Sequence, residues 1–159
     1  MDLLDKYKFA LEARNNEISL FWQRCNYFMV LNTAIAIGFF VRKSNNDEYS
    51  ILLCALGAIV SFIWYLVSIG SKFWQSRWER RLEIIEEEFD GDVNLYSASW
   101  DVIYSDVEES LNNNRHKDLH KFFNWQVKQK PSVSFLMSLL ALVFVGVWAL
   151  MLCWQIWVR

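Results

Sequence analysis

The sequence predicts an all-α integral membrane protein with three transmembrane helices, the second of which continues into a small cytoplasmic helical domain. Uncharged stretches occupy 27–41, 51–71 and 132–158. Charged residues gather between them, and a single proline leaves room for long helices. These observations divide the chain into an N-terminal amphipathic helix (1–24), the first two spans (25–71), a cytoplasmic stalk and helical domain (72–131) and the third span (132–159).

The second and third uncharged stretches are each long enough to cross a bilayer, which takes about 20 apolar residues. The first is shorter, and Cys25 and Asn26 extend it. A cleavable signal peptide is disfavoured, because acidic residues precede the stretch and no small-residue cleavage site follows Phe40. We therefore interpret all three as spans.

Lysine and arginine predict the orientation. Positive residues concentrate in the N-terminal segment and in 72–131, whereas the 42–50 loop has only Arg42 and Lys43 and the C-terminus only Arg159. Positive loops stay in the cytoplasm. The N-terminus and 72–131 are therefore predicted to be cytoplasmic, and the C-terminus to lie on the opposite side.

The predicted stalk carries an apolar seam with a coiled-coil-like period, and the positions opposite it are charged. An exposed seam of this kind requires a partner, from the same chain or from a neighbouring subunit. We therefore predict oligomer or stalk contacts at Trp74, Trp78, Leu82, Ile85 and Phe89.

Beyond a turn at 91–98, a helix is predicted to begin near Ser99 and a short third helix to follow Asn114, closed by Pro131. The N-terminal segment is also amphipathic. It is expected either to lie on the membrane surface or to pack as an ordinary bundle helix.

The spans contain no Asp, Glu, Lys, Arg or His, which disfavours a proton-coupled transporter or a voltage sensor. Polar residues near the first span have two interpretations. Asn26, Asn32 and Thr33 either make hydrogen bonds between helices or line an oligomeric pore.

The stretch "NNNRHKDLH" at 112–120 contains Arg115 and His120 in the R-x4-H spacing of HEPN-type ribonucleases. Five positions on a helix turn through about 500°, so the two side chains do not share a face within one chain. They are candidate catalytic residues only, and structural hydrogen bonding is the alternative. His116 and His120 do share a face, but no third ligand is placed near them, so no metal site is predicted.

Composition excludes several functions. The net charge of −2 offers no basic field for nucleic acid, so direct DNA binding is not expected. Cys25, Cys54 and Cys153 lie in or beside apolar segments, so no disulfide is predicted. The sequence contains no phosphate-binding glycine loop and no nucleophile triad, and no cofactor is predicted.

Three stretches, in order and spacing, resemble the bacterial RipA family of octameric inner-membrane proteins, which is related to the membrane accessory protein of type VI CRISPR systems. They are "LEARNNEISLFWQRCNYF" (11–28), "WYLVSIGSKFWQSRWERRLEIIEE" (64–87) and "PSVSFLMSLLALVFVGVWALML" (131–152). The segment 92–130 matches least, apart from its R-x4-H spacing. The resemblance implies a helical homo-octamer around an axis and, for the CRISPR-associated relative, a pore that supports antiviral defence.

The functional hypothesis is therefore an oligomeric inner-membrane pore or channel-like effector that acts in antiviral defence by perturbing the membrane potential, rather than an enzyme. Its partners would be copies of itself, the lipid bilayer, and a defence effector or nucleic-acid-sensing protein. A membrane-tethered HEPN-like ribonuclease and a non-conducting scaffold that recruits a cytoplasmic partner are the alternatives.

Overall fold

The computed structural model describes residues 2–41, 47–89, 94–113, 121–129 and 132–157, and within these ranges the chain forms helices and turns without a strand. The helices are α1 (Leu3–Val41), α2 (Asp47–Glu87), α3 (Trp100–Asn113), α4 (Lys121–Lys128) and α5 (Val133–Trp157). Three of them, α1, α2 and α5, are long and apolar enough to cross a membrane. The predicted all-α class is therefore confirmed for the described residues, and three of the helices could span a membrane, as predicted.

Helix α1 contains both the predicted N-terminal amphipathic helix and the first predicted span. The amphipathic N-terminal residues and the first uncharged stretch form one helix of 39 residues. Neither proline nor glycine occurs between Leu3 and Ile37, so nothing ends the helix at residue 24. The continuous helix predicted from Ile51 into the stalk is also present, as α2.

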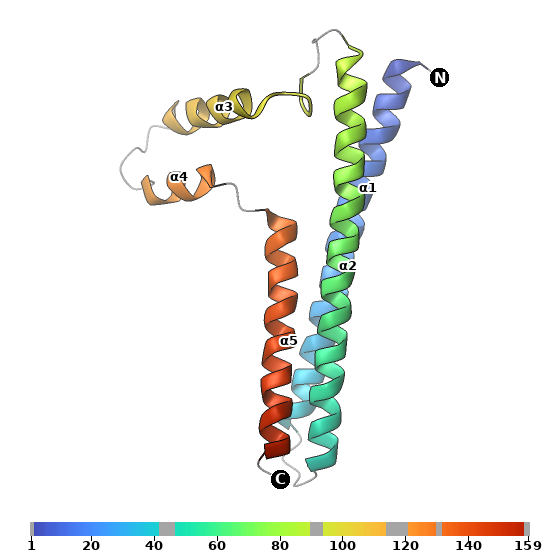
Figure 1. The fold of residues 1–159 in the computed structure, drawn as a ribbon, viewed down its shortest axis with the longest axis vertical. Coiled ribbons are helices and arrows are strands. Elements are labelled where there is room, and N and C mark those ends of the chain that lie inside the picture. Colours follow the sequence, from blue (N-terminus) through green and yellow to red (C-terminus); the bar gives the residue numbers. More distant parts are fainter. Residues whose placement is uncertain (1, 42–46, 90–93, 114–120, 130–131, 158–159) are drawn as a thin grey trace. The chain divides into compact units, whose positions relative to one another are not determined.

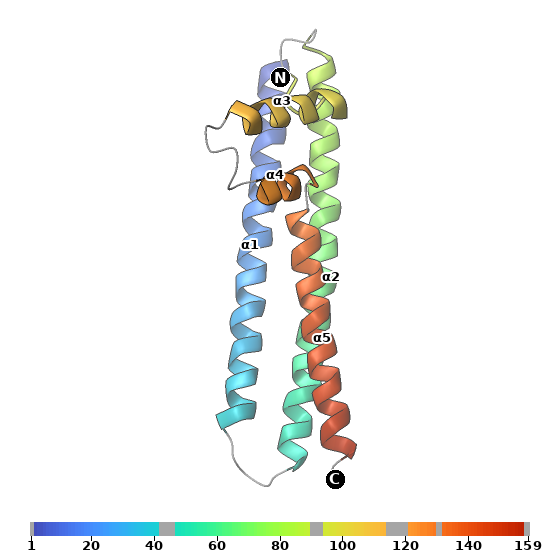
Figure 2. The ribbon, with the colours of Figure 1, turned by 90° about the vertical axis from the view of Figure 1, so that its left-hand side faces the viewer.

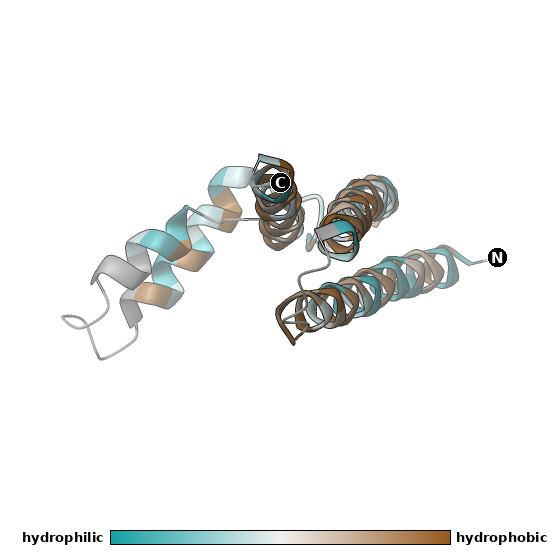
Figure 3. Cartoon of the chain, turned by 90° about the horizontal axis from the view of Figure 1, so that it is seen from below, coloured by the Kyte–Doolittle hydropathy of each residue, from teal (hydrophilic) through white to brown (hydrophobic). Residues whose placement is uncertain are grey.

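The chain divides into two compact units, one of residues 15–75 and 133–159 and the other of residues 1–14 and 76–132. In the first, which we call the membrane unit, α1, α2 and α5 run side by side (Figures 1 and 2). In Figure 3, α5 is predominantly hydrophobic, whereas the N-terminal part of α1 carries hydrophilic turns.

Two apolar clusters hold the membrane unit together. In the first, Phe21 and Cys25 pack with Trp64 and Ala141, and Phe28 stacks on the Trp64 ring at 6.2 Å between centroids. The second contains Ile35, Cys54, Val60 and Trp148. Inward residues recur at alternating steps of three and four along α1 and α2, the spacing that lets two helices interlock side chains over many turns.

The other unit, which we call the stalk unit, has its own core. Tyr7 and Ala10 of α1 are buried against Leu82 of α2. Surrounding apolar side chains complete the cluster: Leu11, Trp78, Ile85, Phe89 and Tyr96. The N-terminal segment therefore packs as a bundle helix, one of the two roles that the sequence left open.

Gly57 of α2 lies directly against the Trp148 ring of α5. A Cβ atom built there would lie 2.4 Å from the Trp148 ring, whereas a Cβ at Gly70 would meet nothing within 4 Å. Gly57→Ala should therefore destabilise the protein by about 1–3 kcal/mol, because the large indole has to move out of a packed core. Thermal unfolding in detergent checks this. Gly70→Ala on the same helix is the control, and equal behaviour of the two variants would contradict this packing.

Candidate functional site

The outward surface of α1 in the membrane unit carries a row of exposed polar side chains. Ser19, Gln23, Asn26 and Thr33 are exposed and fall on one side of the helix, at steps of four, three and seven. The Gln23 amide donates to Ser19 Oγ at 3.3 Å, and the Thr33 hydroxyl donates to the Met29 carbonyl oxygen at 2.9 Å. We call these four residues the polar face of α1.

The exposed positions of α2 and α5 within their predicted spans are apolar. On α2 between 51 and 71 they are Leu52, Leu56, Ile59, Phe62, Ile63, Leu66, Ile69 and Gly70. From Val133 to Trp157 the exposed positions of α5 carry apolar side chains or glycine. Within the predicted spans, the exposed side chains of α1 therefore include an amide and a hydroxyl, those of Asn26 and Thr33, whereas the exposed positions of α2 and α5 are apolar.

Asn32 occupies a junction of all three membrane helices. Its side chain is 1% exposed, and its Oδ1 accepts hydrogen bonds from Ser61 Oγ on α2 at 2.8 Å and from Trp148 Nε1 on α5 at 3.0 Å. Its Nδ2 donates to the Phe28 carbonyl oxygen at 2.9 Å. Asn32 thus makes the interhelical hydrogen bonds that were one of its two predicted roles, and its side chain is enclosed within the protomer.

Two further polar contacts join the same helices near the stalk end of the membrane unit. Arg24 Nη1 donates to Ser71 Oγ at 2.8 Å, which links α1 to α2. Ser134 Oγ donates to Gln75 Oε1 at 3.1 Å, which links α5 to α2. Because Ser61, Ser71 and Gln75 are buried, α2 presents polar groups to both neighbours from its inward side.

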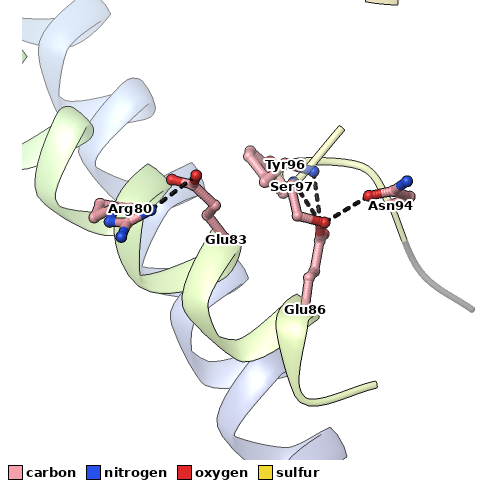
Figure 4. Close-up of polar contacts among 6 residues, drawn as sticks. All are labelled: Arg80, Glu83, Glu86, Asn94, Tyr96 and Ser97. Carbon is pink, nitrogen blue, oxygen red and sulfur yellow. Dashed lines mark hydrogen bonds and ion pairs between the residues drawn. The ribbon is translucent and has the colours of Figure 1, made fainter. Parts of the chain in front are cut away.

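Glu86 organises the stalk unit. Its carboxylate is 1% exposed and accepts hydrogen bonds from the Tyr7 hydroxyl at 2.8 Å, the Tyr96 and Ser97 backbone N–H groups at 2.7 and 2.9 Å, and the Ser97 hydroxyl at 3.0 Å. Figure 4 shows the segment from Asn94 to Ser97 curled over this carboxylate. Glu86 therefore fastens α1, α2 and the segment leading to α3 to one another.

The same contacts shift the pKa values of Glu86 and Tyr7, and both residues lie outside the predicted spans. Burial acts to raise the pKa of Glu86, but the hydrogen bonds from Tyr96, Ser97 and Tyr7 outweigh it and lower the pKa below its ordinary value. Burial, together with the hydrogen bond to Glu86, raises the pKa of Tyr7 to about 12. At neutral pH the pair is therefore a carboxylate and a neutral phenol.

Comparison with known proteins supplies an independent finding. The model of the octameric membrane protein family (8xMP) matches residues 4–157, which is nearly the whole chain. The chain belongs to this family. Neither a curated protein nor a solved structure matches it.

Membership of the octameric membrane protein family confirms that the chain is a membrane protein and supports self-assembly, while the bacterial inner membrane and the orientation of the termini stay predictions. It also explains a protomer that leaves much apolar surface uncovered along α1, α2 and α5. The family match carries no link to RipA proteins or to CRISPR systems, so that part of the resemblance stays a prediction.

The five residues of the predicted stalk seam do not all take the same position in the structure. Trp78, Leu82, Ile85 and Phe89 belong to the core cluster of the stalk unit. Trp74 is 45% exposed, and Gln75 takes the inward position instead. The seam thus finds its partner for those four residues in α1 of the same chain, and the inward period reads 75, 78, 82, 85 and 89 rather than starting at 74.

Arg115 and His120 lie outside the described residues, as does His116. Among the residues that the structure does describe, no group of three or more His, Cys, Asp or Glu is placed to hold a metal ion. All three cysteines are described, and none of them forms a disulfide.

The sequence predicts Glu86 to be one of the charged, solvated positions opposite the seam, and this is wrong, because Glu86 is 1% exposed. Glu86 sits in the run Glu86–Glu88 and there resembles a solvated helix end. An inward position is compatible with helical spacing, since Glu86 falls four residues after Leu82 and Trp148 falls seven residues after Ala141.

Asn32→Ala should lower the stability of the membrane unit by about 1–2 kcal/mol, because the Ser61 hydroxyl and the Trp148 indole N–H lose their acceptor in an apolar interior. Thr33→Val is the matched control, since the Thr33 hydroxyl bonds only within its own helix. Thermal unfolding in detergent measures both. Equal loss in the two variants would contradict a three-helix junction at Asn32.

Glu86 should make the stalk unit sensitive to acid. A folded-state pKa below the unfolded value means that the carboxylate stabilises the fold at pH above about 4.3, and that this contribution falls away as pH drops through the folded value. Tryptophan fluorescence of the stalk unit during acid titration tests this. Glu86→Gln should weaken the unit at neutral pH and flatten its response to acid below about pH 4.3, the ordinary pKa of glutamate. A variant with the same acid response as the original chain would exclude Glu86 as the cause.

Proposed function

We propose that the chain assembles into a homo-oligomeric pore or channel-like effector of the bacterial inner membrane, with the polar face of α1 turned toward its axis. The supporting observation is that the predicted first span exposes Asn26 and Thr33, whereas the exposed positions of α2 between 51 and 71 and of α5 are apolar. Polar groups that face hydrocarbon without a partner are costly, whereas a neighbouring subunit or a water-filled axis satisfies them.

The proposed pore would carry no ring of fixed charge at α1. Its polar face consists of Ser19, Gln23, Asn26 and Thr33, and Val30 and Ile37 continue the same side as apolar positions. A ring of amides at Gln23 and Asn26 with a narrower apolar stretch beyond it offers little preference between cations and anions. Apolar constrictions of this kind can also close a channel by losing water.

The N-terminus and residues 72–131 would lie in the cytoplasm and the C-terminus in the periplasm, following the distribution of lysine and arginine. In this orientation the stalk unit is the part that meets a cytoplasmic signal or a defence-system partner. Opening would dissipate ion gradients, which is the antiviral action that the resemblance to the CRISPR-associated relative implies.

The sequence alone also suggests two other functions. A membrane-tethered HEPN-like ribonuclease would use Arg115 and His120, which lie outside the described residues. RNA cleavage by the purified oligomer, lost in Arg115→Ala and His120→Ala, would identify it. A non-conducting scaffold would recruit its partner through the stalk unit and would show no conductance in any state.

Cysteine accessibility tests the proposed pore. Asn26→Cys in a Cys153→Ser background should conduct ions in a planar bilayer and lose conductance when a charged thiol reagent is added, because the reagent enters the aqueous axis. Leu139→Cys is the control, since Leu139 is an exposed apolar position of α5. In cells, infection should depolarise the membrane in the presence of the chain. The absence of conductance and depolarisation in every state, or block at Leu139→Cys alone, would overturn the pore.

A further inference from the structure

The exposed side of α1 in the membrane unit repeats with the period of a coiled coil. Exposed residues follow one another at alternating steps of four and three: Ser19, Gln23, Asn26, Val30, Thr33 and Ile37. This alternation averages 3.5 residues, the spacing that keeps one side of a helix against a partner over many turns. We call these residues the outer seam of α1, and it contains the polar face.

The outer seam lies on nearly the opposite side of α1 from the residues that pack within the protomer. Phe21 and Cys25 are buried in one apolar cluster and Ile35 in the other. Asn32, on the same inward side, bonds to both α2 and α5. Because α2 and α5 occupy the inward side, a helix that follows the period of the outer seam comes from outside the protomer.

The polar residues of the outer seam indicate which helix that is. Asn26 and Thr33 are exposed within the predicted first span, where polar groups require a hydrogen-bonding partner. The exposed positions of α2 between 51 and 71 and of α5 offer neither an amide nor a hydroxyl. A second α1 brings both at the same depth, and the family is octameric, so a second copy of the chain is available.

We propose that the outer seams of α1 in neighbouring copies contact one another directly, each residue beside the same residue of the next copy. In a closed ring, copies of one residue approach most closely on the side that faces the axis. The Asn26 amides then exchange hydrogen bonds between copies, and the Val30 side chains pack against one another. Asparagine at such a position in a coiled coil also fixes the register of the helices.

This contact rests on the orientation of α1 in the proposed pore, but it requires self-assembly and not ion conduction. It names the neighbour of the polar face, which the proposed pore leaves as either another subunit or water.

Cysteine cross-linking tests the contact with two pairs of adjacent positions. Val30→Cys and Thr33→Cys place a thiol on the outer seam, and Leu31→Cys and Ala34→Cys are their controls. All four positions are exposed, and each control is one residue away at nearly the same depth but turned by about 100° around α1. The background is Cys153→Ser, because Cys153 is exposed whereas Cys25 and Cys54 are buried.

Mild oxidation of the assembled oligomer should give several-fold more disulfide-linked dimer at Val30→Cys and Thr33→Cys than at Leu31→Cys and Ala34→Cys. Equal amounts at the four positions, an excess at the two controls, or no dimer at any position would overturn the contact. The last result is expected if the outer seam faces lipid or lines a wide aqueous axis.

Charge substitution at Asn26 provides a second measurement that does not depend on disulfide geometry. Asn26→Asp and Asn26→Lys should each weaken assembly, seen as smaller species on dilution in detergent, because like charges meet at every contact. Co-expression of the two variants should recover assembly, since opposite charges then alternate around a ring with an even number of copies. Leu31→Asp with Leu31→Lys is the control pair and should not recover. Failure to recover at Asn26, or equal recovery at Leu31, would refute the contact.

The contact and the proposed pore can fail separately. Excess dimer at Val30→Cys and Thr33→Cys, in an oligomer that conducts in no state, would support the contact and overturn the pore. Loss of conductance when Asn26→Cys is modified, without excess dimer at the outer seam, would support the pore and overturn the contact.

Discussion

The hydrocarbon core of a membrane requires every polar group to find a partner, and this requirement explains the arrangement of the three membrane helices. Serine and glutamine of α2 point inward, where Asn32, Arg24 and Ser134 meet them. Helix α5 exposes apolar side chains and places its Trp148 N–H on the Asn32 amide. The polar face of α1 is exposed in the protomer, and in the proposed pore it contacts other subunits or water.

The two units use buried polar groups in different ways. In the membrane unit, Asn32 binds three helices through neutral donors and acceptors, which lock their register without placing a charge in an apolar interior. In the stalk unit, the buried group is the charged carboxylate of Glu86. It is tolerable there because several donors surround it, including two backbone N–H groups.

Much of the fold follows from local properties of the sequence. The uncharged stretches predict the spans, and the absence of helix breakers predicts the long α2. The seam at Trp78, Leu82, Ile85 and Phe89 was visible from spacing, but its partner was not, because an apolar seam fits α1 as well as another subunit. Asn32 and Glu86 show the same limit. Whether a polar residue is a helix contact, a pore lining or a solvated end depends on the neighbour that packs against it, which comes from elsewhere in the chain.

The proposed pore requires α1 to turn its polar face inward in the assembled oligomer while α2 and α5 face lipid. Electron cryomicroscopy of the oligomer in lipid nanodiscs tests it most directly, since it places each helix relative to the axis. If the proposed pore is right, α1 is the innermost helix, and Asn26 is directed toward the axis or toward a neighbouring subunit. An oligomer in which the polar face of α1 lies against lipid, and α2 or α5 surrounds the axis, would contradict it.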